Sequence, residues 1–253
     1  MVVAATLVAL TACNVIEPLD PSLDARFLTT VGDDDHGVTL AGGPDDVTVT
    51  APASNTGVDT RIVVWRRADP VAADQSVCAS WTDPPDQANH QAGVALRVRP
   101  TDGGASAVTV TRNIFWGAFW GFNVHVWDGN RSPAIIKIAG FELPAAVRRG
   151  GDPVPVTAPF PWRLCARIVG DVLTFKVWAA DIPEPAWGDP LYGGSVTLPP
   201  GWEAPGHAGG YVGHVPPGSS FTLTDLTVAP VAPANAAASA APPRAPTAIA
   251  QAP

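Results

Sequence analysis

Three short stretches of the chain alternate apolar residues with side chains that could hold a ligand. FNVHVWD (122–128) does so with an amide, an imidazole and an indole, VALRVR (94–99) with two guanidinium groups, and LTFKVW (173–178) with an ammonium group and an indole. Flat indole rings stack on the apolar C–H patches of sugars, while amide and cationic groups donate hydrogen bonds to hydroxyl or acidic groups. The candidate ligand-binding residues are Arg97, Arg99, Asn123, His125, Trp127, Lys176 and Trp178.

The alternation also predicts which side of each strand these residues occupy. Successive side chains of a strand point to opposite faces, so one set is core and the other faces outward. Val94, Leu96 and Val98, for example, are predicted to point inward. We expect the seven candidates to share one sheet face. That face is either an open binding surface or a second core covered by long loops, because Trp is highly buried on average.

The same period of two recurs along most of the chain. At least ten short runs rich in β-branched or aromatic residues, such as DVTVTA, SAVTVTR and SFTLTDLTV, are bounded by Gly, Pro, Asp or Asn. Gly170 and Asp171 separate two of these runs and suit the two-residue type II′ turn of a hairpin. No segment of the sequence has the 3.6-residue period of a convincing amphipathic helix. The sequence therefore predicts an all-β fold, a two-sheet antiparallel jelly-roll sandwich.

A family resemblance adds to this expectation. The order ALRVRP, FNVHVWD, LCARIVGDVLTFKVW and EPAWGDP, followed by GGYVGHVPPGSSFTLTDLTV, resembles the concanavalin A-like lectin and laminin-G-like jelly roll over roughly residues 25 to 230. It is similar in particular to exported actinobacterial proteins of this fold without an assigned activity. The resemblance implies that sugars lie on the outward surface of the concave sheet, with calcium often nearby.

Glycosidases of this fold use a pair of carboxylates, and the sequence does not contain a motif for such a pair. The glucanase branch carries Glu-x-Asp-x-x-Glu on one strand, and a retaining glycosidase needs two carboxyl groups about 5 Å apart. Glutamate occurs here only as the isolated Glu17, Glu142, Glu184 and Glu203, and no Gly-x-Ser-x-Gly elbow is present. We predict binding of a glycan or other cell-envelope component without catalysis. The alternatives are a glycan hydrolase or lyase with an unrecognised site, and a structural envelope protein that binds protein partners.

The N-terminus has the pattern of an export signal. Residues 2–10 (VVAATLVAL) form an apolar run with the length of a signal-peptide core, and LTAC resembles the lipobox of bacterial lipoproteins, although no Lys or Arg precedes the run. We expect a signal peptide over 1–12, a lipid on Cys13 and a tether over 13–25. The β-sandwich then spans 26–229, and the Ala/Pro-rich residues 230–253 form a disordered tail. This places the protein outside the cytoplasmic membrane, held to the membrane or cell envelope by its lipid.

The chain has three cysteines, and lipidation of Cys13 leaves Cys78 and Cys165 to form a disulfide. Two separate buried thiols are the alternative.

Charge and acidic residues bear on partners and cofactors. With a net charge of −8, the sequence lacks the excess of basic residues that is typical of proteins that bind nucleic acid. Asp33, Asp34, Asp35 and His36 form a hard-oxygen group that could take Ca²⁺, but they lack the spaced Asp-x-Asp-x-Asp-Gly pattern and a solvated turn explains them as well. We expect no cofactor, with calcium as the alternative.

Overall fold

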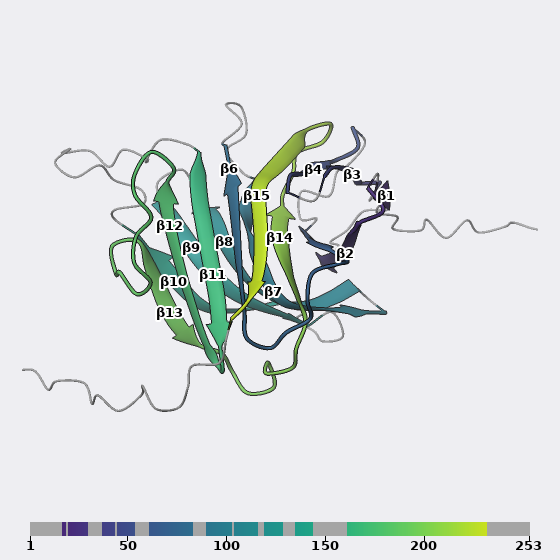
Figure 1. The fold of residues 1–253 in the computed structure, drawn as a ribbon. Coiled ribbons are helices and arrows are strands. Elements are labelled where there is room, and N and C mark those ends of the chain that lie inside the picture. The colour runs from purple at the N-terminus through teal and green to yellow at the C-terminus, as the bar shows by residue number, and fades with distance from the viewer. Residues whose placement is uncertain are drawn as a thin grey trace, which may run out of the picture.

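The computed structural model describes residues 17–18, 20–29, 37–43, 45–53, 61–82, 90–102, 104–115, 119–128, 135–143 and 161–231. Over these ranges the chain forms strands β1 to β15 and no helix. The strands make two sheets that pack face to face, as Figure 1 shows. The predicted all-β jelly-roll sandwich is confirmed.

One sheet has eight strands. Their order is β1 (Glu17–Pro18), β3 (Thr39–Gly42), β4 (Val47–Thr50), β15 (Ser220–Pro230), β6 (Gln75–Trp81), β11 (Trp162–Val169), β12 (Val172–Ala179) and β13 (Gly193–Thr197). All neighbours pair antiparallel except β1 and β3, which are parallel.

The other sheet has seven strands, all antiparallel. Their order is β10 (Ile135–Glu142), β9 (Phe119–Asp128), β8 (Gly104–Phe115), β7 (Gln91–Thr101), β14 (His207–Gly213), β5 (Arg61–Arg66) and β2 (Leu23–Thr29).

The main core lies between the sheets and takes every second residue of the central strands. Phe122, Val124 and Val126 of β9 are buried there, as predicted. Leu173, Phe175 and Val177 of β12 meet them from the opposite sheet. The Phe122 and Phe175 rings have centroids 6.0 Å apart, so the two sheets interlock directly at the middle of the sandwich.

The predicted hairpin joins β11 to β12. Val169 pairs with Val172, and Gly170 between them has φ +60° while Asp171 has no positive φ. This is the combination that a type II′ turn requires, and it explains the glycine at the first central position.

The sandwich begins before residue 26, where we had placed its start. Leu23 and Ala25 of β2 are buried in the main core, and Glu17–Pro18 pair with β3. At the other end, β15 ends at Pro230, next to the predicted boundary at 229. Cys13, the aspartates at 33–35, His36 and the tail from 232 onward lie outside the described residues. None of the described segments is a helix that could cross a membrane.

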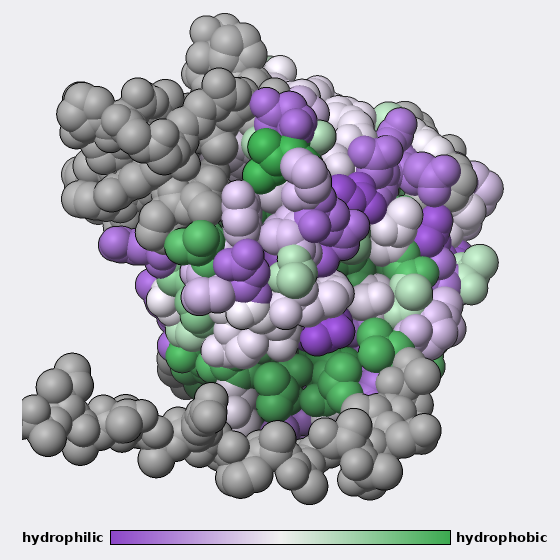
Figure 2. Space-filling view, turned by 60° about the vertical axis from the view of Figure 1, so that its left-hand side comes forward, coloured by the Kyte–Doolittle hydropathy of each residue, from purple (hydrophilic) through white to green (hydrophobic). Residues whose placement is uncertain are grey.

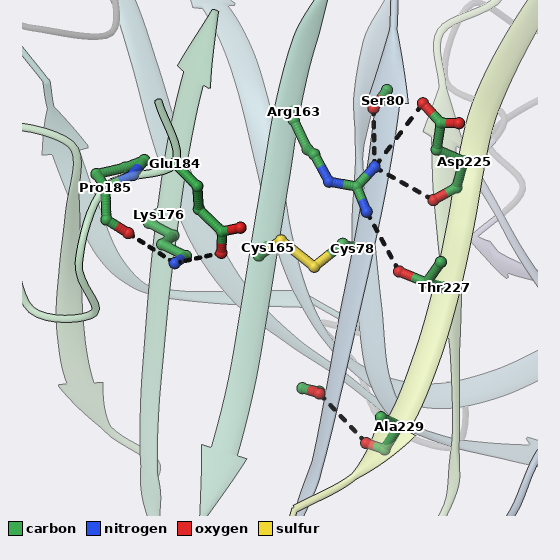
Figure 3. Close-up of a disulfide and its surroundings, with 11 residues drawn as sticks. Cys78, Ser80, Arg163, Cys165, Lys176, Glu184, Pro185, Asp225, Thr227 and Ala229 are labelled. Atoms are coloured by element: carbon green, nitrogen blue, oxygen red, sulfur yellow. Dashed lines mark hydrogen bonds and ion pairs between the residues drawn. A yellow bond between two sulfur atoms is a disulfide. The ribbon is translucent and has the colours of Figure 1, made fainter. Parts of the chain in front are cut away.

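The disulfide between Cys78 and Cys165 is confirmed (Figure 3). The two cysteines are register partners on the adjacent strands β6 and β11, with Cα atoms 4.1 Å apart. Val77, Ala79, Leu164 and Ala166 beside them point into the main core, so the bridge lies on the outer face of the eight-stranded sheet.

Removing this bridge tests its contribution to stability. Replacing Cys78 and Cys165 together by Ser should lower the free energy of unfolding by roughly 4 kcal/mol, because a closed loop of this length restricts the unfolded chain. Chemical denaturation of the oxidised protein and the double variant measures the difference. Equal midpoints would show that the bridge adds no stability.

Candidate functional site

The seven candidate residues lie on two different sheets. Arg97 and Arg99 belong to β7, and Asn123, His125 and Trp127 to β9, all in the seven-stranded sheet. The remaining two, Lys176 and Trp178, belong to β12 in the eight-stranded sheet. The prediction of one shared face is therefore wrong. Alternation fixes the side of its own strand on which a residue lies, but not the sheet that the strand joins.

A bulge in β7 changes the direction of Arg97. The register shifts between Leu96 and Arg99, and Arg97 has a left-handed φ of +49°. A bulge inserts one residue and reverses the alternation beyond it. Val98 accordingly joins Ala95 on the outer face, whereas we had expected it in the core with Leu96.

Arg97 is fully engaged within the protein. It is only 2% exposed, and its backbone N–H donates to Oε1 of Gln75 at 3.0 Å. Its guanidinium donates to three carbonyl oxygens: Ala73 at 2.9 Å, Gly170 at 2.6 Å, and Trp202. Burial lowers the pKa of Arg97, and the carboxylate of Asp74 opposes that change. With each guanidinium nitrogen bonded to a loop carbonyl, this side chain is a structural anchor.

Arg99 lies near the same anchor. It is half-buried, and its guanidinium carbon is 5.9 Å from the centroid of the Trp202 ring. Trp202 also supplies a carbonyl to Arg97. Arg97 thus contacts the backbone of Trp202 and Arg99 contacts its ring, so both arginines hold the segment between β13 and β14.

On the other sheet, Lys176 clamps the segment that follows β12. Its ammonium donates to the carbonyl of Pro185 at 2.7 Å and pairs with Glu184 at 2.6 Å (Figure 3). It also lies 4.5 Å from the ring centroid of Trp187 and 5.5 Å from that of Trp178. Lys176 and Trp178 are 3% and 4% exposed, so both act beneath this segment and not on an open face.

The surface on this side of the molecule is mostly polar. Figure 2 shows hydrophilic and near-neutral atoms over its middle and hydrophobic atoms gathered along its lower edge. Large exposed apolar side chains in the described part of the chain are Val71, Ile136, Val172 and Leu191. Residues of this kind occur on ordinary protein surfaces and mark no site by themselves.

The outer face of the seven-stranded sheet contains a second apolar cluster centred on Trp127. This side chain is fully buried and donates from Nε1 to Oγ1 of Thr109 at 2.8 Å. Its ring lies 6.2 Å from that of Tyr211, whose hydroxyl donates to Oε1 of Gln91 at 2.9 Å. The other members are Leu28, Val63, Trp65, Ala95, Val98, Ala105 and Ala107. Of the two alternatives left open for this face, the burial of Trp127 favours the second core.

Small residues make room for these rings. Ala95, Ala107 and Gly93 lie on the strands between Trp127 and Tyr211, so the two aromatic side chains can meet across them. A methyl group added to Gly93 would collide with the carbonyl oxygen of Val110. The small side chains at the centre of the sheet therefore leave the space that Trp127 and Tyr211 fill.

His125 and Asn123 continue the same outer face as a polar region. They are 9% and 4% exposed, and Nδ1 of His125 has no hydrogen-bond partner. Thr111, which pairs with Asn123, is fully buried and its Oγ1 is likewise without a partner. Burial is the main cause that lowers the pKa of His125 to about 4, followed by the charges of Lys137 and Arg61. This imidazole is therefore neutral at pH 7.

Sequence reasoning missed Lys137, Arg61 and Thr111 as members of this region. Lys137 pairs with His125 from β10, and Arg61 places its guanidinium carbon 5.6 Å from the Trp127 ring centroid. Arg61 is the first residue of the run RIVVWR and Lys137 lies within the run AIIKIAGF, and neither is close in sequence to His125. Only strand pairing brings them to His125.

The described residues contain no group of three or more His, Cys, Asp or Glu side chains that could hold a metal ion. The Asp33–Asp35 and His36 set lies outside them, so calcium there stays a prediction.

Solved structures show which fold this is. No protein-family model matches the chain, and no curated protein matches its sequence. The exoplasmic/lumenal domain of VIP36 in its Ca²⁺/Man-bound form is 13% identical with a TM-score of 0.50, and the match covers 86% of each chain. The legume lectin-like domain from Entamoeba histolytica is 11% identical with a TM-score of 0.49, covering 83% of this chain and 91% of that one. The carbohydrate-binding module CBM66 from Bacillus subtilis is 8% identical with a TM-score of 0.47, covering 85% and 99%. At 13% identity, the likeness to the VIP36 domain shows the fold alone, a jelly-roll sandwich.

Truncating Trp127 distinguishes a second core from an open binding face. Trp127→Ala should lower the free energy of unfolding by roughly 3 to 5 kcal/mol, because it leaves a large cavity between Thr109 and Tyr211. Thermal and chemical denaturation measure this. A variant as stable as the parent would place Trp127 on an open surface.

Arg97→Met should cost roughly 3 to 5 kcal/mol, because buried carbonyls lose a charged donor. Arg163→Met is the matched control. Arg163 is 25% exposed and its four contacts on the outer face of the eight-stranded sheet lie at 3.1 to 3.8 Å, so about 1 kcal/mol is expected. Equal losses in the two variants would refute the anchoring role of Arg97.

Proposed function

We propose that this protein binds a glycan of the cell envelope on the outer face of its seven-stranded sheet, without chemical turnover. The observation that carries the proposal is the pair of buried polar atoms without partners, Nδ1 of His125 and Oγ1 of Thr111. Buried polar groups are normally satisfied, and each exception costs about 1 to 3 kcal/mol. A ligand rich in hydroxyl groups offers the donors and acceptors that this region lacks.

The neighbouring side chains suit such a ligand. Asn123 can both donate and accept, Thr109 adds a hydroxyl, and Lys137 on β10, the last described strand of this sheet, is exposed. Trp127 has no surface left for a sugar ring, so its role in this proposal is to support His125, whose ring centroid lies 5.7 Å away. Arg97, Arg99, Lys176 and Trp178 are left out of the proposed contact set because they hold loops elsewhere.

Binding without catalysis is favoured by the residues around His125. The outer-face positions of β7, β8 and β9 in the described residues carry no carboxylate. Two of the four glutamates have structural contacts, since Glu184 pairs with Lys176 and Glu203 accepts the N–H of Gly201. A hydrolase would need two carboxyl groups around the scissile bond. The fold agrees with the proposal, because the VIP36 domain that shares it is recorded with mannose.

We further propose that the protein is exported and lipid-anchored through Cys13. The disulfide between Cys78 and Cys165 supports export, because such bridges persist in oxidising compartments. The lipobox-like LTAC supports the anchor. A lipid at this position would hold the glycan-binding domain at the outer face of the cytoplasmic membrane or in the cell envelope.

Substituting the proposed lipid site tests the anchor. Cys13→Ala should move the protein from the membrane fraction to the soluble fraction, because the acyl chains supply nearly all of its affinity for lipid. Fractionation and immunoblotting measure the distribution. A Cys13→Ala protein that stays in the membrane fraction would exclude the anchor.

A glycan array probed with the purified chain tests the binding function. Asn123→Ala and His125→Ala should weaken a glycan hit by roughly 1 to 3 kcal/mol each, while Arg163→Ala on the other sheet should leave it unchanged. Product analysis on each hit then separates binding from hydrolysis. An array without hits would contradict the proposed site. So would a glycan that the Asn123→Ala and His125→Ala variants bind with the affinity of the parent.

A further inference from the structure

Two cations converge on His125 in a chain whose net charge is −8. Lys137 and Arg61 are the charged groups that act on this imidazole, and both disfavour its protonation. Among the described side chains of β9, Nδ1 of His125 is the buried polar atom without a hydrogen-bond partner, and the exposed Lys137 lies beside it on β10.

The groups that face His125 come from several strands. From β10, Lys137 is its register partner, and an atom added to Gly140 would lie 2.9 Å from the Lys137 ammonium and 3.4 Å from Oδ1 of Asn123. The ammonium therefore lies across Gly140, on the side of Asn123. From β8, the partner of His125 is the uncharged Thr109.

The remaining two strands add one cation and one phenol. Arg61 of β5 lies over the ring of Trp127, and Tyr211 of β14 packs against the same ring. Asp128 is on the same strand as His125, but at a position that alternates to the opposite face. Among the described residues, the charged groups that act on the imidazole are thus Lys137 and Arg61, and the phenol of Tyr211 contacts Trp127 and Gln91.

We propose that this region binds acidic sugars, with the sugar carboxylate seated at His125 beside Lys137. The inference rests on the proposed function and names its ligand class. A carboxylate would accept hydrogen bonds from the Lys137 ammonium and from Nδ1 of His125, and it would favour the charged imidazolium that Lys137 disfavours. A neutral sugar can satisfy the same nitrogen but brings no negative charge to Lys137.

This arrangement makes binding pH-dependent with a defined sign. In the free protein the pKa of His125 is about 4, because burial and two cations disfavour the charged imidazolium. A bound carboxylate favours the charged form and therefore raises that pKa. The complex then takes up a proton, so acidic sugars bind more tightly as the pH falls from 7 toward the free value, and the gain ends there. A neutral sugar gains nothing from acidification.

The test compares sodium glucuronate with its methyl ester, which is the same sugar without the charge. The His125 imidazole resonances of the full chain are followed by NMR at pH 7 and pH 5, in low and high salt. We expect glucuronate to shift these resonances, to raise the pKa of His125, and to bind at least 10-fold more tightly than the ester at pH 5. High salt should reduce this preference, because Lys137 is exposed.

Three variants assign the effect to its residues. Lys137→Gln should remove most of the preference for the acid over the ester, and His125→Gln should remove the pH dependence. Arg163→Gln makes the same charge change as Lys137→Gln on the other sheet and should keep the preference.

Each remaining outcome has a distinct meaning. Equal affinity for glucuronate and its ester, or resonances of His125 that do not respond to glucuronate, would overturn this inference. Neutral hits on the glycan array that depend on Asn123 would in that case leave the proposed function intact. An array without any hit would overturn both.

Discussion

The hydrogen bonds of Arg97 connect the seven-stranded sheet to the eight-stranded sheet and its loops. This residue belongs to the seven-stranded sheet, yet its partners are Gln75 at the start of β6, the loop carbonyl of Ala73 and the β11–β12 turn at Gly170. These partners belong to the eight-stranded sheet or its loops. A cation buried at the rim of a sandwich is costly, and it is stable here because three carbonyls and Asp74 compensate it. The bulge is what turns the side chain toward them.

The bulge also determines the composition of the outer face beyond it. Because Val98 is turned outward with Ala95, the seven-stranded sheet gains apolar contacts on its second side. Trp127, Trp65 and Tyr211 complete a second core there, and the stacking of Trp65 on His207 at 5.3 Å extends it to the end of β14. The sheet thus buries side chains on both faces over much of its area. A polar region around His125 lies on the β8–β9–β10 side of this face.

The two outer faces use their cations in different ways. On the eight-stranded sheet, Lys176 is neutralised by Glu184 and enclosed by two indole rings, so its charge serves to hold a segment of the chain. On the seven-stranded sheet, Lys137 and Arg61 act together on a neutral imidazole. The first arrangement is complete within the protein. The second leaves Nδ1 of His125 without a hydrogen-bond partner beside the exposed Lys137, and a ligand can supply that partner.

The sequence by itself determined the class of fold, the inward and outward sides of β9 and β12, the turn at Gly170 and the pairing of Cys78 with Cys165. Each of these follows from local properties: the two-residue period of a strand, the positive φ that a type II′ turn requires, and the number of cysteines. Tertiary structure alone decided that β12 and β9 belong to different sheets, that Arg97 turns at a bulge, and that Lys137 and Arg61 meet at His125. The physical reason is that strand order and register depend on contacts between residues far apart in the chain, as when Arg61 reaches Trp127. Alternation within a strand carries no information about its neighbours or about a bulge, so the candidate residues of β9 and β12 were placed on the correct sides of their strands, whereas Arg97 was not, and the set was not placed correctly with one another.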